Sequence, residues 1–191
     1  MKSVLRLSVL SLVVLLVSAC SKPNDTYRPM GYLRIDLPDT AYHHYHSDRI
    51  PVSFDLSDHA MPTYHDSISG GLTLVYPELK ARVYCDYKAV QSNLRQLSED
   101  AYDFVQKHNV KAYGISALPC GSPDRQVYGL FYYLRGREVA SPIQFVLTDS
   151  TNHFFRGALY FDMHVNQDSL SPVIDYLGDD IMRMIDSFEW Q

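Results

Sequence analysis

The sequence predicts an α+β domain in which an antiparallel sheet is covered by two helices. Several short stretches alternate apolar and polar residues, which is the pattern of half-buried strands. Two longer stretches repeat apolar residues every three or four positions, as amphipathic helices do. The connections between the later strands are too short for parallel crossovers. Strands grouped around two helices that can cover one face of a sheet give an α+β sandwich.

The first strands are predicted from alternation. Leucine and isoleucine alternate with charged residues in 31–38, which predicts a half-buried strand that ends at a proline. Residues 52–56 alternate in the same way, and the stretch between them, 42–46 (Tyr-His-His-Tyr-His), is interpreted as a polar aromatic connection. Residues 72–76 and 81–87 flank a Pro-Glu-Leu-Lys loop, so they are expected to form a hairpin.

The period of the apolar residues changes between residues 92 and 108. Apolar side chains recur there at three- and four-residue steps, with Leu97, Ala101 and Val105 in one stripe. We therefore expect an amphipathic helix over 92–108. Ser92 is its expected N-cap, because a serine hydroxyl can accept from the free N–H groups of the first turn.

The strongest strand signals follow this helix. Residues 125–134 are rich in aromatic side chains and place Phe131 and Tyr133 on one face. Residues 143–148 alternate, and 154–161 return after a connection rich in turn-forming residues. These three strands are predicted to form an antiparallel meander.

The last element is predicted to be a helix over residues 172–188. A continuous apolar stripe runs along it from Val173 to Phe188. Ser171 is placed to cap this helix, and Pro172 suits the first helical position because an N–H there would lack a partner in any case.

The first 20 residues have the organisation of a lipoprotein leader. Lys2 and Arg6 supply the positive charge, and residues 7–17 form an apolar stretch that is too short to cross a ~30 Å hydrocarbon core. Residues 17–20 (Val-Ser-Ala-Cys) fit the bacterial lipobox, whose cysteine becomes the lipidated N-terminus. Cys20 would carry diacylglycerol on its thiol and an acyl chain such as palmitate on its amine, which together anchor a protein stably. The alternative is plain secretion with an incidental cysteine.

Three segments are therefore predicted: a signal peptide at 1–19, a lipidated tether at 20–30 and a single globular domain at 31–191. No second apolar run of 18 or more residues follows the leader, so the domain is expected to be tethered to the membrane and not embedded in it. Removing the leader changes the formal charge from −5 to −7, because it carries two basic and no acidic residues. That balance argues against nucleic-acid binding, which depends on neutralising phosphates.

Eight histidines raise the question of a metal site. Five of them lie near one another in the sequence and near two aspartates: His43, His44, His46, His59 and His65, with Asp48 and Asp58. Neutral imidazoles with carboxylates can hold Zn²⁺ or Cu²⁺. However, neither an HExxH motif nor a paired Cys/His spacing occurs, so a solvated polar loop is the favoured interpretation. No metal or other cofactor is expected.

The ingredients of an acyl-transfer site are Ser141, Asp149, Ser150 and His153. The sequence has no G-x-S-x-G elbow, and these residue types are common in turns for conformational reasons alone. The carboxylate pair Asp179 and Asp180 is expected on the polar face of the last helix, as solvated charge. We therefore expect no enzymatic activity.

Cys85 and Cys120 remain once Cys20 is assigned to lipid. The exported compartment is oxidising, so the two can form a disulfide across the first helix if their Cα atoms lie within ~7 Å. The alternative is two separate cysteines, because Cys85 shares its strand face with apolar residues, as a small buried hydrophobic residue would.

Two blocks of the sequence resemble the gliding-motility lipoprotein GldD family of the Bacteroidota. The opening block at 31–38 is Gly-Tyr-Leu-Arg-Ile-Asp-Leu-Pro. The more distinctive block at 140–161 is Ala-Ser-Pro-Ile-Gln-Phe-Val-Leu-Thr-Asp-Ser-Thr-Asn-His-Phe-Phe-Arg-Gly-Ala-Leu-Tyr-Phe. Tyr-Gly-Leu at 128–130 and Asp-Ser-Leu at 168–170 follow the family's order. The resemblance covers essentially the whole chain and is weakest from residue 59 to 71.

The resemblance implies a cell-envelope lipoprotein that serves gliding motility and the associated type IX secretion machinery. It implies an accessory or assembly role in support of other lipoproteins of the apparatus, and it carries no catalytic residue over to this chain. The late strands and the closing residues 185–188 also resemble the PsbP/Mog1-like sandwich fold, which says little about function.

Within the distinctive block, His153 and Arg156 are the residues expected to contact a partner, because both can donate hydrogen bonds to a carboxylate. Gly157 permits a bulge or a close backbone approach, although relief of packing beside Phe154 and Phe155 is the favoured interpretation.

The predicted function is that of a lipid-anchored, non-enzymatic interaction protein at the periplasmic face of the outer membrane. Its expected partners are other envelope lipoproteins or secretion and motility components. The alternative is an envelope hydrolase or a glycan-binding module that acts on peptidoglycan or polysaccharide. That alternative requires several of Asp149, Ser150, His153 and Arg156 to meet in one concave pocket.

Overall fold

The computed structural model describes residues 37–64, 70–107, 111–163 and 167–191. The chain divides into two units, Met1–Tyr32 and Leu33–Gln191, and all of the described residues belong to the second unit. The predicted signal peptide, Cys20 and the tether lie outside the described residues and stay predictions. Most of the strand predicted at 31–38 also lies outside them, and its described end, Leu37 and Pro38, has no regular structure.

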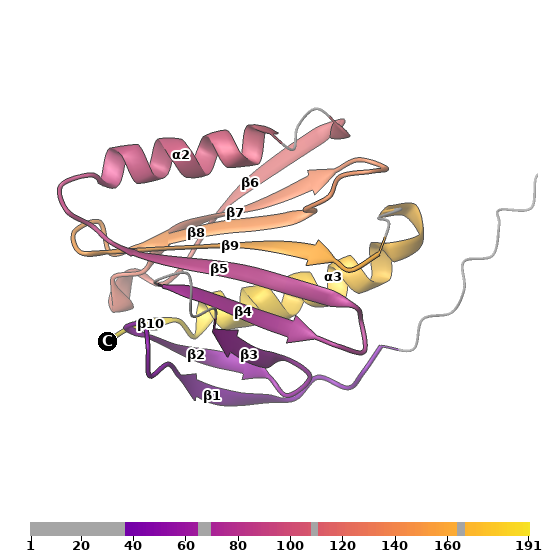
Figure 1. Cartoon of the computed structure of the whole chain (residues 1–191), viewed down its shortest axis with the longest axis horizontal. Coiled ribbons are helices and arrows are strands. Elements are labelled where there is room, and N and C mark those ends of the chain that lie inside the picture. Colours follow the sequence, from indigo (N-terminus) through magenta and orange to yellow (C-terminus); the bar gives the residue numbers. More distant parts are fainter. Residues whose placement is uncertain (1–36, 65–69, 108–110, 164–166) are drawn as a thin grey trace, which may run out of the picture. The chain divides into compact units, whose positions relative to one another are not determined.

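A seven-stranded antiparallel sheet forms the middle of this unit (Figure 1). Its strand order is β3-β4-β5-β9-β8-β7-β6, and each neighbouring pair runs antiparallel. The strands are β3 (Met61–Tyr64), β4 (Gly71–Tyr76), β5 (Ala81–Ala89), β6 (Gly114–Cys120), β7 (Tyr128–Arg135), β8 (Ile143–Thr148) and β9 (His153–Phe161). The predicted β4–β5 hairpin and the predicted β7-β8-β9 meander are both confirmed.

A second sheet of three strands has the order β1-β2-β10. Its strands are β1 (Tyr42–His46), β2 (Val52–Ser57) and β10 (Glu189–Trp190). The interpretation of residues 42–46 as a connection is wrong, because they pair in register with β2 as an edge strand. An edge strand has a neighbouring strand on one side only, so few of its side chains need to be apolar. The histidines of β1 are accordingly exposed.

The two helices cover opposite faces of the seven-stranded sheet (Figure 1). They are α2 (Leu94–Lys107) and α3 (Gln167–Asp186). Strand β8 explains the arrangement, because it is apolar on both sides: Phe145 packs in the cluster with α3, and Val146 packs in the smaller cluster with α2. The predicted α+β sandwich of an antiparallel sheet and two helices is therefore confirmed, although the helices do not share one face.

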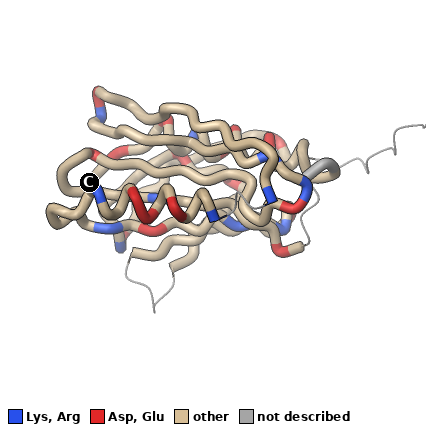
Figure 2. The backbone as a smooth tube through the Cα atoms, turned by 90° about the horizontal axis from the view of Figure 1, so that it is seen from above, with Lys and Arg blue, Asp and Glu red and all other residues tan. Residues whose placement is uncertain are grey.

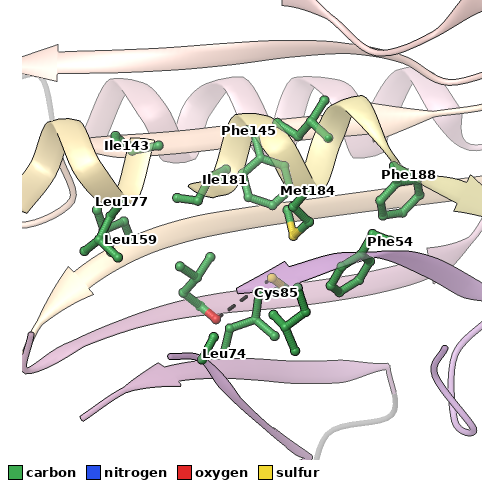
Figure 3. Packing of buried hydrophobic residues seen from close by; sticks show 14 of the residues in the cluster. Phe54, Leu74, Cys85, Ile143, Phe145, Leu159, Leu177, Ile181, Met184 and Phe188 are labelled. Carbon is green, nitrogen blue, oxygen red and sulfur yellow. Dashed lines mark hydrogen bonds between the residues drawn. The ribbon is translucent and has the colours of Figure 1, made fainter. Parts of the chain in front are cut away.

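The main core lies between the seven-stranded sheet, α3 and the three-stranded sheet (Figure 3). Phe188, which follows α3, stacks on Phe54 of β2 with ring centroids 5.9 Å apart and contacts Phe155 of β9 at 5.3 Å. Ile181 and Met184 of α3 are also fully buried in this core. Full burial of a side chain of this size stabilises the fold by about 1.5–3 kcal/mol.

Both helices begin at residues other than those predicted. The carbonyl of Asn93 accepts the Leu97 N–H at 3.0 Å, so Asn93, not Ser92, holds the N-cap position of α2. Helix α3 starts at Gln167 and contains Pro172 within its second turn. A proline so near the start removes one backbone hydrogen bond without ending the helix. Among the described residues, no helix is long and apolar enough to cross a membrane.

Candidate functional site

A cavity of about 320 Å³ lies between α2 and the sheet face that α2 covers. Helix α2 contributes Phe104 to its wall, and the sheet contributes the floor. One row of paired residues crosses this floor from strand to strand: Thr73, Tyr84, Ala158, Gln144 and Tyr132. Ala158 is the smallest member of this row and stands between Tyr84 and Gln144, so its short side chain leaves a hollow beneath the helix.

An ion pair lies beside this hollow. Arg156 of β9 approaches Oδ2 of Asp86 on β5 at 3.5 Å, and Lys88 approaches the same oxygen at 3.6 Å. The Arg156 guanidinium also lies over the ring of Phe104, 5.4 Å from its centroid, which connects the sheet to α2. Charges of both signs are spread along the chain (Figure 2), and the acidic residues of α2, including Asp100, are exposed.

Two buried polar atoms of the cavity lack a hydrogen-bond partner among the described residues. One is Nε2 of Gln144, a residue that is only 3% exposed, and the other is Oδ1 of Asp86. Buried polar groups are almost always hydrogen-bonded in folded proteins, so each exception calls for an explanation. Here both exceptions line the same cavity.

The two predicted partner-binding residues lie on opposite faces of β9. Arg156 faces α2, whereas His153 faces the other side, where its ring stacks on Trp190 with centroids 5.1 Å apart. The Tyr87 hydroxyl also forms a 2.8 Å hydrogen bond with Nδ1 of His153. Both residues are therefore engaged within the molecule, and they do not form one surface. Gly157 does relieve packing, but against the ring of Phe145 and not beside Phe154 and Phe155.

The candidate acyl-transfer residues do not meet. Oδ1 of Asp149 accepts backbone N–H groups from Thr151, Asn152 and His153 at 2.8–3.0 Å and so shapes the turn between β8 and β9. Burial alone would raise the pKa of Asp149, but these N–H donors lower it to about 2. Ser141 is fully buried and Ser150 is exposed. Asp149 thus acts as a turn-forming residue.

The disulfide considered between Cys85 and Cys120 is wrong, since both cysteines are free. They lie on β5 and β6, which are separated by three strands, or by about 19 Å at ~4.8 Å per strand. The Cys85 thiol is buried in the core and donates to the Val83 carbonyl at 3.9 Å (Figure 3). Burial raises the pKa of both thiols, that of Cys120 to about 11, so neither is a reactive thiolate.

The expectation that Asp180 is a solvated charge is also wrong. Its side chain is 3% exposed and points between α3 and the small sheet, where the Tyr42 hydroxyl donates to Oδ1 at 2.7 Å. Burial raises the pKa of Asp180, and the Tyr42 hydrogen bond lowers it only in part. Asp179, its neighbour, is exposed as expected.

The histidines near β1 form separate pairs with carboxylates. Nδ1 of His43 lies 2.6 Å from Asp58, and that of His44 lies 3.4 Å from Asp55. His59 contacts the Asp39 carbonyl at 3.0 Å, and His65 lies outside the described residues. Within the described ranges, no three His, Cys, Asp or Glu side chains are grouped as a metal site would require.

The cavity is the feature that the sequence did not reveal. A signal was present at Gln144, because a large amide interrupts the otherwise apolar run of β8 on a strand buried on both faces. The pairing of Asp86 with Arg156 could not be inferred, since it depends on β5 and β9 being neighbours although 70 residues separate the two side chains.

Comparison with known proteins adds three findings. Among solved structures, the chain is similar to cyanobacterial PsbP (CyanoP) from Synechocystis sp. PCC 6803, with 12% sequence identity and a TM-score of 0.47. That similarity covers 83% of this chain and 98% of the other. A comparison with curated proteins finds no match. The family described as gliding motility lipoprotein GldD matches residues 22–190.

The family match extends over almost all of the chain, including every strand and both helices described above. It confirms the resemblance that the blocks at 31–38 and 140–161 indicated. At the level that the match supports, the protein is a gliding-motility-related lipoprotein of the cell envelope, held at a membrane by its lipid. The chain belongs to the gliding motility lipoprotein GldD family.

Proposed function

We propose that this lipoprotein is anchored through Cys20 at the periplasmic face of the outer membrane and supports gliding motility and type IX secretion by binding another envelope protein. Its partners are other envelope lipoproteins or components of the secretion and motility machinery, and it acts without catalysing a reaction. The lipid anchor confines one binding surface to the membrane, which raises its effective concentration towards partners in the same envelope.

An exposed apolar surface at the β6 edge of the sheet carries the proposal. We define the β6 edge surface by Tyr113, Leu118, Tyr128 and Leu130, all of them exposed. Tyr113 is 81% and Leu118 is 53% exposed. By the strand register, Leu118 points to the same sheet face as Phe131, whereas Tyr128 and Leu130 point to the other face, so the exposed apolar side chains lie on both sides of the β6 edge. Exposed apolar side chains beside an unpaired strand edge favour an interaction site there.

The strand β6 adds a second reason to expect a protein partner there. Among the described residues β6 pairs only with β7, so its other side can accept an incoming strand. A cavity of about 350 Å³ opens beside it and is lined by Pro119, Pro123 and Tyr128, among others. A partner side chain inserted into such a hollow would fix the position of the contact.

Affinity capture of the native lipoprotein from cross-linked envelopes tests the proposal. We expect another envelope lipoprotein or a secretion component to co-purify. A Cys20→Ala variant should lose labelling by a fatty-acid analogue and should recover less of the same partner, because it is no longer confined to the membrane. Capture of no other envelope protein by the native lipoprotein would contradict the partner-binding role. Persistent fatty-acid labelling of the variant would contradict the anchor.

The hydrolase alternative has no support in the site. Of the four side chains that it requires in one pocket, Arg156 alone lines the cavity under α2, while Asp149 shapes a turn and His153 faces the opposite side of the sheet.

A further inference from the structure

Two residues of the cavity under α2 hold a buried hydrogen-bond donor and a buried acceptor that have no partner among the described residues. Nε2 of Gln144 can donate, and Oδ1 of Asp86 can accept. A fold selected only for stability would place an apolar residue at position 144, because an unpaired amide in the interior is unfavourable. A ligand that both accepts and donates hydrogen bonds could pair these two groups.

The charges around the cavity disfavour an ionic ligand. Arg156 and Lys88 both approach Oδ2 of Asp86, at 3.5 and 3.6 Å, so the carboxylate is already compensated. A cation would meet two positive groups, and an anion would have to displace Asp86 from them. An uncharged ligand avoids both penalties, and its hydroxyl groups can serve Oδ1 of Asp86 and Nε2 of Gln144 at once, since a hydroxyl both donates and accepts.

The remaining walls are largely aromatic. Phe104 comes from α2, and Tyr84, Tyr132 and Tyr160 come from the sheet. A saccharide fits this combination, because it carries hydroxyl groups at its rim and apolar C–H faces that pack against aromatic rings. A cavity of about 320 Å³ is at the small end of the size range of ligand pockets, which suits one or two sugar units.

Two other ligand classes fit less well. An acyl chain would fill the apolar part but would leave Gln144 and Asp86 unpaired. An extended peptide gains its affinity from backbone pairing at a sheet edge. The floor strands β5, β9 and β8 already pair on both sides, so they have no free backbone groups to offer.

We propose that this cavity binds an uncharged saccharide unit, with Gln144 donating to it, Asp86 accepting from it, and Phe104 and Tyr132 packing against its apolar face. Tyr84 is the exposed member of the floor row, whose other four residues are buried, so the ligand enters beside Tyr84. This site is separate from the β6 edge surface, and it holds whether or not that surface binds a protein.

Ligand binding to the full lipoprotein in lipid nanodiscs tests the proposal by saturation-transfer difference NMR. The probes are N,N′-diacetylchitobiose, maltose and cellobiose, with octanoate as the acyl probe. We expect at least one disaccharide to bind saturably. Ala158→Leu fills the hollow and should weaken that binding by about tenfold or more. Ala117→Leu is the matched control, because Ala117 continues the same floor row on β6 but is exposed and outside the cavity.

A second variant distinguishes a ligand group from a structural one. Gln144→Leu removes the unpaired amide at similar volume, so it should abolish disaccharide binding while the melting temperature stays equal or rises. The proposal is overturned if no disaccharide binds, or if binding is insensitive to Ala158→Leu. It is also overturned if Ala158→Leu weakens the binding of octanoate but of no disaccharide, or if Gln144→Leu lowers the melting temperature.

Discussion

Asp149 is half-buried and Asp180 is buried, and their surroundings shift the pKa of the two carboxyl groups in opposite directions. At Asp149, burial is outweighed by backbone N–H donors, which lower the pKa to about 2. At Asp180, burial dominates and raises the pKa. The Asp149 carboxylate therefore stabilises the folded protein at pH values above its ordinary pKa of about 4. This stabilisation is lost as the pH falls through about 2. Protonated Asp180 stabilises the folded protein at pH values below about 4. This stabilisation is lost as the pH rises through the pKa of Asp180 in the folded state.

These opposite pKa shifts predict that an Asp→Asn substitution has opposite effects on stability at the two positions. Asp180→Asn should raise the melting temperature near neutral pH, because a buried charge is removed while Tyr42 can still donate to the amide oxygen. The gain should vanish in acid, where Asp180 is already protonated. Asp149→Asn should lower the stability near neutral pH by about 1–2 kcal/mol, and this loss should shrink in acid. Thermal unfolding across the acid-to-neutral range measures both, and a parallel response of the two variants would contradict the assignment.

Gly157 is required by the close approach of a neighbouring ring. A Cβ at this position would overlap the Phe145 side chain, which is buried in the main core and cannot move aside freely. Gly157→Ala should therefore destabilise the domain by about 1–3 kcal/mol in urea unfolding. Gly114→Ala is the control, because a Cβ there has open space within 4 Å and should change little. Equal effects of the two variants would exclude this packing explanation.

At the scale of elements, the two helices are held to the sheet to very different degrees. Among its described side chains, helix α3 buries seven apolar ones, whereas α2 buries only Ala101 and Val105 and otherwise rests on a small satellite cluster. Each fully buried apolar side chain contributes about 1.5–3 kcal/mol, so α2 is the weaker attachment.

Hydrogen exchange followed by mass spectrometry tests this difference. We expect the amides of α2 to exchange through local opening, well before those of α3, which should exchange only on global unfolding. Val105→Ala should accelerate exchange in α2 further and leave α3 nearly unchanged. Equal protection of the two helices in the native protein would contradict the predicted independence of α2. This mobility also bears on the cavity, because Phe104 of α2 forms part of its wall.

The sequence predicted those elements whose residues alternate or repeat clearly. Strands β2, β4, β5, β7, β8 and β9 and both helices were expected, with shifts of a few residues at their ends. The elements that were missed are at sheet edges: β1, β3, β6 and β10. Edge strands bury little, so β6 (Gly-Ile-Ser-Ala-Leu-Pro-Cys) shows neither alternation nor a continuous apolar run. Their pairing is decided by the rest of the fold.

The same reasoning explains which site residues can be predicted from the sequence. The sequence predicts partner contacts at His153 and Arg156, and these stay predictions. The face that each side chain occupies depends on the exact start of β9, which is His153 and not residue 154 as predicted. The sequence predicts a surface charge at Asp180, because it is paired with Asp179 on the expected polar face of the last helix. Only the small sheet, which covers this side of α3, makes the site of Asp180 an interior one.

For the whole molecule, two surfaces with different chemistry lie on one sheet. The cavity under α2 has largely aromatic walls and includes the unpaired groups of Gln144 and Asp86, as a small-ligand site can. The β6 edge surface carries exposed apolar side chains on both sides of an edge strand, which a partner protein could cover. A lipid-anchored domain that carries both could join a protein of the secretion or motility machinery to a component of the envelope.

Site-specific photo-cross-linking in cells tests the central claim most directly. A benzoylphenylalanine is placed at Leu118 on β6 or, as a control, at Met61 on β3, the opposite edge of the same sheet. The native side chains at the two positions are 53% and 54% exposed, so the photo-reactive group is about equally accessible to other proteins at either position. We predict a discrete adduct with another envelope lipoprotein or secretion component at position 118 and none of the same mass at position 61. Absence of any adduct at 118, or the same adducts at both positions, would contradict binding through the β6 edge surface.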